Sequence, residues 1–257
     1  MKSVLSEIDA IVKKLANIYS SASISSGMGA EFEMWLVLKI AERLQKSSYN
    51  ATLRNASDTR LTPGENFVLR GNPGRLGRGQ ACHVLFFWKT QPYEIHANTQ
   101  FRGRSTETHE IDIAIIPQAI AAHLRAIGGG RPTGQPRVAI ECKFKDSVGS
   151  KDEARQIVAR QFDMHFLDGH PLPWKGTKHT IWPEASPNLG SGASKITYKN
   201  SFASCFNALC RLGGVTVPTG VFLSFNSVTV FSGLKPGTSK VNDFLNELEL
   251  YLASQSP

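Results

Sequence analysis

The chain has few cysteines, no long apolar run and fewer acidic than basic residues. The four cysteines among its 257 residues are Cys82, Cys142, Cys205 and Cys210. They form no Cys-x-x-Cys pair and no disulfide-framework spacing, which favours a reducing compartment. No apolar run approaches the ~20 residues that span a bilayer, and Glu7 and Asp9 interrupt any signal-peptide core. We therefore expect a soluble cytoplasmic protein with no membrane partner.

The shortage of acidic residues leaves a strongly basic chain. Lys and Arg number 29 against 21 for Asp and Glu, so the net charge is +8, and the pI is about 9.4. Hydrophobic residues make up 41% and charged residues 19%, a globular balance that argues against overall disorder. The positive excess favours a polyanionic partner, most often nucleic acid. A generally basic soluble protein is the alternative.

Two amphipathic helices are predicted near the N-terminus. Apolar residues recur at helical spacing over residues 3–19, and a Ser-rich link over residues 20–27 leads to a second helix over residues 29–46. Glu33 lies on the apolar stripe of the second helix. A carboxylate there is costly unless a cation or hydrogen bonds meet it. Glu33 is therefore either a structural residue paired with an arginine or part of a site.

Strands are predicted through the middle of the chain. The expected segments are strands at 84–88, 93–101, 109–116 and 138–145, with a short helix at 118–127. Asp112 lies on the polar face of the third strand, opposite a face filled by isoleucines. Glu141 and Lys143 share one face of the fourth, because strand side chains alternate. About one Glu-x-Lys is expected by chance in a chain of this length, so its context must decide.

Arginine and glutamine side chains are the candidate nucleic-acid contacts. Residues 50–104 are rich in arginine, and residues 70–79 form a glycine-rich loop that suits phosphate oxygens or guanine edges. A helix that begins at Ser150, with Glu153 three residues later, follows the last of these strands. The candidates are Arg70, Arg75, Arg78, Arg102, Arg104, Gln156, Arg160 and Gln161. The alternative for the loop is a solvated basic surface without function.

The last third of the chain is expected to complete a single domain of 257 residues. Residues 166–200 are rich in Pro and Gly, which predicts an irregular segment. A helix is predicted at 201–212, two strands that could form a hairpin at 215–225 and 228–231, and a final amphipathic helix at 241–253.

The order of these elements and charges resembles the PD-(D/E)XK, or restriction-endonuclease-like, nuclease superfamily over residues 28–165. Asp112 and Glu141 match its metal-binding acids, although no proline precedes Asp112, where the superfamily's name places one. Lys143 matches its lysine, and Glu33 matches the glutamate of its first helix. The resemblance implies an α/β fold with a restriction-endonuclease-like core, a mixed central sheet flanked by helices. The N-terminal amphipathic helix would be an addition to that core.

The chemistry of these residues agrees with the resemblance. Carboxylate oxygens of Asp112 and Glu141 and the backbone carbonyl of Cys142 could bind Mg²⁺, with Mn²⁺ as a substitute. Lys143, partly buried, is expected to have a lowered pKa and to orient or deprotonate the attacking water. Glu33 could complete a second metal site or fix a water network. The alternative is a structural cluster in which Lys143 neutralises the acids.

We therefore expect Mg²⁺-dependent phosphodiester hydrolysis, foremost by a DNA endonuclease of a restriction or other defence system. The resemblance implies products with 5′-phosphate and 3′-hydroxyl ends. A structure-specific nuclease or exonuclease of DNA repair is one alternative, and a non-catalytic DNA-binding module with the same fold is another. Two symmetric sites readily make a double-strand cut, so a homodimer is a further expectation.

Overall fold

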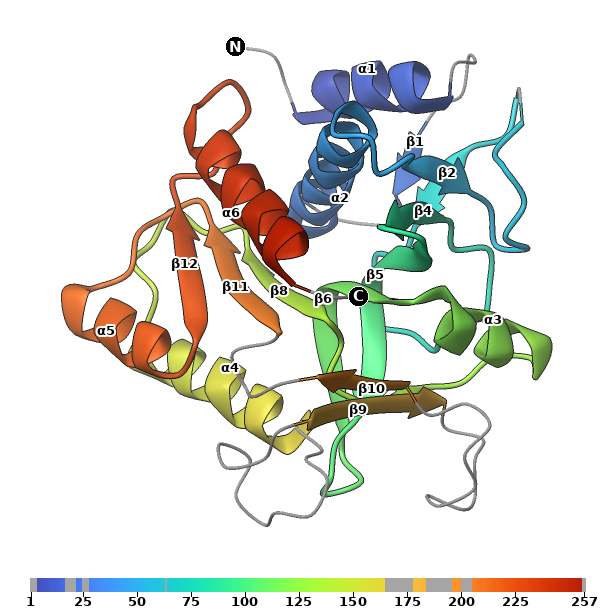
Figure 1. Cartoon of the computed structure of the whole chain (residues 1–257). Coiled ribbons are helices and arrows are strands. Elements are labelled where there is room, and N and C mark those ends of the chain that lie inside the picture. The colour runs from blue at the N-terminus through green and yellow to red at the C-terminus, as the bar shows by residue number, and fades with distance from the viewer. Residues whose placement is uncertain are drawn as a thin grey trace.

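A mixed β-sheet forms the centre of the fold in the computed structural model of the chain (Figure 1). The structure describes residues 4–16, 22–24, 28–62, 64–164, 178–183, 196–199 and 205–255. The sheet's strands are β2 (Thr52–Arg54), β4 (His83–Trp88), β5 (Gln91–Arg102), β6 (Thr108–Pro117), β7 (Pro132–Gly134), β8 (Val138–Lys143), β9 (Lys178–Pro183), β10 (Ile196–Lys199), β11 (Phe206–Arg211) and β12 (Val228–Ser232). A separate parallel pair joins β1 (Ala22–Ile24) to β3 (Phe67–Leu69).

Parallel and antiparallel pairing occur in the same sheet. The main order is β10, β9, β7, β5, β6, β8, β11, β12, and β4 pairs with β5 and with β2. Neighbours from β4 through β5 and β6 to β8 are antiparallel, whereas β8, β11 and β12 run parallel. The predicted mixed central sheet is confirmed.

Helices cover both faces of this sheet. They are α1 (Val4–Ala16), α2 (Met28–Lys46), α3 (Gln118–Ala126), α4 (Lys151–Met164), α5 (Val217–Phe225) and α6 (Lys240–Ser254). On one face α1, α2 and α6 share a core with Ile113 and Ile140. On the other, α3 packs near Ala114, and α4 and α5 pack near Leu209. Figure 1 shows α2 and α6 on one side of the central strands and α4 on the other. No helix in the described ranges is long and apolar enough to cross a membrane.

The elements with clear periodicity agree with the predictions. The helices α1, α2, α3, α4 and α6 and the strands β4, β5, β6 and β8 all lie within a few residues of the predicted bounds. The predicted cap of α4 is also confirmed, because the Glu153 N–H donates to Ser150 Oγ at 3.1 Å. Pro117 is the last residue of β6, as the sequence indicated.

Two predictions for the last third of the chain are wrong. Residues 201–212 are predicted as a helix, but residues 206–211 form β11, and residues 201–204 lie outside the described part. Residues 215–225 are predicted as a strand, but α5 occupies residues 217–225. The strand predicted at 228–231 is confirmed as β12. It follows a helix and pairs in parallel with β11, so the predicted hairpin is wrong.

The segment predicted to be irregular, residues 166–200, contains two strands. β9 and β10 form an antiparallel pair, and β9 also pairs with β7. These strands extend the sheet beyond β7, so the prediction is wrong over residues 178–183 and 196–199. The other residues of that segment lie outside the described part of the chain.

Candidate active site

A cleft opens where β6 and β8 separate. The pairing of these strands ends at Ile113 and Ile140, and the next residues, Asp112 and Glu141, line the cleft. Asp112 Oδ2 accepts the Cys142 N–H at 2.7 Å, so a side chain replaces the missing strand contact. The cleft has a volume of about 810 Å³ and also receives residues of α2 and α4. Strand separation therefore places two largely buried acids against the cleft at the end of the sheet.

The four predicted catalytic residues, Glu33, Asp112, Glu141 and Lys143, all line this cleft. Lys143 Nζ lies 2.6 Å from Glu141 Oε1 and 3.7 Å from Asp112 Oδ2. Arg160 Nη2 of α4 lies 2.7 Å from the same Glu141 oxygen. The structure therefore brings these side chains together from four elements, α2, β6, β8 and α4.

Asn98 of β5, which was not predicted as a site residue, holds Glu33 in place. Asn98 Nδ2 donates to Glu33 Oε2 at 2.5 Å and to the Arg70 carbonyl at 2.7 Å. The flanking register of β5 and β6 puts Asn98 opposite Asp112. Its φ of 49° is left-handed, a conformation that asparagine tolerates better than most residues. Glu33 therefore has an amide partner, and among the described residues no arginine pairs with it, as the structural alternative would require.

Negative charge exceeds positive charge among the described residues that line the cleft. The acids are Glu33, Glu110, Asp112, Glu141, Glu153 and Asp163, and the bases are Lys143 and Arg160. Glu153 pairs with Arg211, and Asp163 pairs with His109. The four remaining carboxylates share two cations, so two negative charges stay unbalanced when all are ionised.

The pKa values reflect this crowding. Burial raises the pKa of Glu33 to about 7, against the Asn98 hydrogen bond, which lowers it. Burial raises the pKa of Asp112 well above its usual range, and the nearby Glu141 carboxylate raises it further. Burial and Glu141 likewise raise the pKa of Glu110. A cation bound among these groups would favour their ionised forms.

The predicted lowered pKa of Lys143 is wrong. Burial lowers the pKa of Lys143, but the Glu141 and Asp112 carboxylates outweigh burial, and the pKa is raised above its ordinary value. Lys143 is therefore a protonated donor in this arrangement. It is suited to orient a water or to stabilise a phosphate oxygen, rather than to take up a proton.

No protein-family model, curated protein or solved structure matches this chain. Its chemistry has to be inferred from the side chains that meet in the cleft. Hard carboxylate oxygens beside protonated Lys143 and Arg160 suit a divalent cation together with a phosphate group. Because the Cys142 N–H faces Asp112, and a strand residue directs its N–H and C=O to the same side, the Cys142 carbonyl remains a candidate ligand.

A second polar group at the cleft was not predicted. Asp163 of α4 accepts His109 Nε2 and Ser105 Oγ, both at 2.6 Å, and the Ser105 N–H at 2.9 Å. All three residues line the cleft. Gly103 makes room for them, because a Cβ there would lie 1.8 Å from Asp163 Oδ2. The turn between β5 and β6 is thus fastened to the end of α4.

The candidate contacts on α4 divide between the cleft and the core. Gln156 and Arg160 line the cleft, as expected for ligand contacts. Gln161 is 4% exposed and lies beside Ile111 and Ile157, between the helix and the sheet. Gln161 is therefore buried between α4 and the sheet. It does not lie on the surface predicted to contact nucleic acid.

The candidate arginines of residues 70–104 differ in exposure. Arg78 and Arg104 are exposed, and Arg70, Arg75 and Arg102 are partly buried. Arg104 adjoins the cleft, because its N–H donates to the Asp163 carbonyl at 2.8 Å and its guanidinium lies 4.8 Å from the Phe162 ring. Arg70 Nη2 donates to the Arg78 carbonyl at 2.6 Å and closes the glycine-rich loop. Arg70 therefore has a structural contact, whereas Arg104 is exposed at the rim, where a ligand could reach it.

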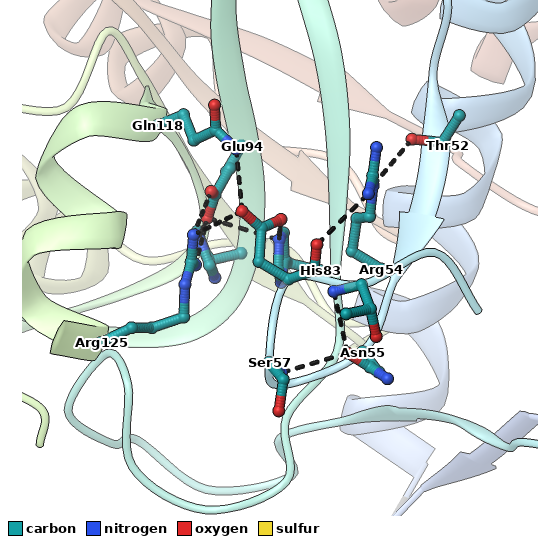
Figure 2. A network of polar contacts seen from close by, with 11 residues as sticks. Thr52, Arg54, Asn55, Ser57, His83, Glu94, Gln118 and Arg125 are labelled. Carbon is teal, nitrogen blue, oxygen red and sulfur yellow. Dashed lines mark hydrogen bonds and ion pairs between the residues drawn. The ribbon is translucent and has the colours of Figure 1, made fainter.

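A buried network of charged residues lies apart from the cleft (Figure 2). Asp58, His83 and Glu94 have ligand atoms within 4.8 Å of one another, the one such group of His, Cys, Asp or Glu found in the described ranges. Arg125 Nη1 and Nη2 lie 2.8 and 2.7 Å from the two oxygens of Glu94, and Nη2 is 3.1 Å from Asp58 Oδ2. Figure 2 shows Gln118 and Arg125 reaching from α3 toward this group.

The network is the weaker candidate for a metal. Glu94 is fully buried, and Arg125 contacts both Glu94 and Asp58, so its guanidinium occupies carboxylate oxygens that a metal ion would need. His96 also contacts Glu94, with Nε2 2.8 Å from Oε2, and its pKa is lowered to about 4, chiefly by burial. The network therefore joins α3 to β4 and β5 as a set of paired charges.

Proposed function

We propose that this chain is a divalent-cation-dependent nuclease that hydrolyses phosphodiester bonds in DNA, as an endonuclease of a restriction or other defence system. The observation that supports this is the meeting of Glu33, Asp112, Glu141 and Lys143 in one open cleft. A DNA phosphate would be repelled by these carboxylates unless a cation bound with it. The mixed sheet flanked by helices agrees with the PD-(D/E)XK membership that we propose on the same residues.

The donor atoms fit Mg²⁺ and also Mn²⁺. Asp112 and Glu141 offer carboxylate oxygens, Cys142 offers a carbonyl, and Glu33 is placed for a second ion or a bound water. When bound, the cation would neutralise charge on the phosphate and supply an activated water. Acids that share a bound cation are expected to have raised pKa values when no cation is bound. Glu33 and Asp112 both have raised pKa values.

The chain's own cations act on the phosphate. Lys143, kept protonated by Glu141 and Asp112, can donate to an oxygen on which negative charge grows in the transition state. Arg160 and Gln156 approach from α4, on the other wall of the cleft. The net charge of +8 favours long-range attraction of DNA toward the molecule.

Cleavage of supercoiled circular DNA, compared with the same DNA made linear, tests this function. With Mg²⁺ or Mn²⁺ the wild-type chain should nick and linearise the circle, and with EDTA it should leave the circle intact. Asp112→Asn and Lys143→Met should each reduce the rate at least about 100-fold while circular dichroism stays unchanged. Asp152→Asn, an exposed acid on α4, is the matched control and should cleave at the wild-type rate.

The outcomes separate the alternatives. Full activity in Asp112→Asn and Lys143→Met would contradict the assignment of the cleft. Cleavage of linear ends or branched junctions with no attack on the closed circle would favour a repair-type nuclease. Equal DNA binding with Mg²⁺ and with EDTA, without any cleavage, would indicate that the chain is a non-catalytic DNA-binding module.

A further inference from the structure

Helix α5 carries an apolar stripe on its outer side. Val217, Val221 and Phe225 are 81%, 65% and 88% exposed, and Phe222 is 38% exposed. The helix sequence, VPTGVFLSF, contains no charged residue. Apolar patches of this size on a soluble protein commonly mark an interaction surface.

The inner face of α5 is already used within the chain. Thr219 and Leu223 are buried, and Leu223 packs with Ile157 of α4. Because the stripe of Val217, Val221 and Phe225 lies on the other side, α5 is apolar nearly all round. Helices with this pattern are normally buried on every side. Figure 1 shows α5 at the periphery of the molecule, beyond β12.

A groove continues this surface toward α6. It has a volume of about 610 Å³ and is lined by residues of α5, β12 and α6, among them Gly220, Ser224 and Leu250. Leu250 is 62% exposed. Within the described part of the chain, β12 is an edge strand that pairs with β11 alone. The groove therefore lies between α5 and the exposed Leu250 of α6 and borders the sheet edge.

We infer that a second copy of this chain covers the α5 stripe, in a two-fold symmetric pair of antiparallel α5 helices. Val217 and Phe225 lie four residues on either side of Val221, about 6 Å along the helix in each direction. With Val221 on the two-fold axis, Val217 of one copy meets Phe225 of the other. A small side chain then faces a large one at both ends, as an isologous contact requires.

The size and charge of the surface suit a self-association. The five exposed apolar side chains offer on the order of 600 Å² per copy, and the groove's rim would bring this near the ~800 Å² per partner of a standard interface. Each copy carries a net charge of +8, so two copies repel each other overall. The uncharged stripe is where two copies can approach without placing like charges together.

The pairing would bring two clefts into one particle. Helix α5 packs on α4, and α4 supplies Gln156 and Arg160 to the cleft. The association itself does not depend on the proposed nuclease function. Only its consequence, coordinated cuts in both strands, depends on that function.

Sedimentation velocity at micromolar concentrations tests the pairing. The wild-type chain should sediment as a dimer. Val221→Glu should raise the dimer dissociation constant at least 100-fold, because it sets two carboxylates against each other at the axis. Ile127→Glu changes a similarly exposed apolar residue, 46% exposed at the end of α3, and should remain dimeric.

A cysteine variant gives a second, independent measurement. The four native cysteines are buried, so Val221→Cys adds an accessible thiol at the proposed axis. Mild oxidation should link two Val221→Cys chains, whereas Ile127→Cys should stay unlinked. A monomeric wild-type chain would overturn the inference and assign the stripe to a different protein. A dimer that survives Val221→Glu and resists linkage through Val221→Cys would overturn it as well.

Discussion

Glu33 and Lys143 show how the neighbours of a side chain determine its charge. The helical stripe correctly predicted that Glu33 needs a partner, but the partner is Asn98, which comes from a strand 65 residues later. Lys143 was expected to have a lowered pKa, yet two carboxylates within 4 Å raise its pKa and favour the protonated form. A sequence gives residue types, and long-range contacts decide their pKa values. This is why Glu33 and Lys143 were predictable as residues of the cleft and their protonation was not.

The Glu33 carboxyl predicts a pH dependence of stability. Its pKa rises from 4.5 to about 7 on folding, so the folded chain retains a proton that the unfolded chain releases. That contribution is complete below about pH 4.5 and is lost as the pH rises through about 7. Asp112, whose pKa is also raised, acts in the same direction.

Thermal melts in EDTA between about pH 5 and pH 8 measure this effect. The melting temperature of the wild-type chain should fall across this range more steeply than that of Glu33→Gln, which is neutral throughout. Asp152→Asn should keep the wild-type slope, because this acid is exposed. Identical slopes for Glu33→Gln and the wild type would show that Glu33 titrates normally in the folded chain.

Among the elements, β11 and α5 carry sequence signals that favour the wrong type of structure. Strand β11 is buried at all six positions, so it lacks the alternation that identifies a strand, and its Ala, Leu and Cys residues suit a helix equally well. Helix α5 is rich in Val and Phe, which favour strands. Pro218 and Gly220 disfavour a strand, and Thr216 caps the helix, with Oγ1 accepting the Thr219 N–H at 3.3 Å. The proline, the glycine and the cap therefore outweigh the strand propensity of the Val and Phe residues.

The serines at the starts of α4 and α6 differ in whether their side chains cap the helix. Ser150 Oγ accepts the Glu153 N–H, whereas Ser239, at the start of α6, makes no side-chain cap hydrogen bond. Ser150→Ala should therefore lower the free energy of unfolding by about 1 kcal/mol, and Ser239→Ala should change it by much less. Urea denaturation of both variants measures the difference. Equal losses would mean that the Ser150 hydrogen bond contributes nothing specific to α4.

At the scale of the whole molecule, a basic chain contains an acidic cleft. The net charge is +8, while four carboxylates share two cations at the end of β6 and β8. Asp112, Glu141 and Lys143 were predictable because their strands carry an apolar pattern that makes the charges conspicuous. His109 and Asp163 were not, because their contact arises where the β5–β6 hairpin meets the end of α4. Asn98 was not, because its role arises where β5 meets α2. The contrast in charge supports a cation that joins the cleft to a polyanion.

Titration of the chain with Mn²⁺, followed by the electron paramagnetic resonance signal of the free ion, tests the central claim that Asp112 and Glu141 hold a divalent cation. Asp112→Asn should weaken binding at least about 10-fold. Asp58→Asn, which alters the other group of potential ligands, should bind Mn²⁺ like the wild type. Unchanged binding in Asp112→Asn, or binding that is lost only in Asp58→Asn, would contradict the account.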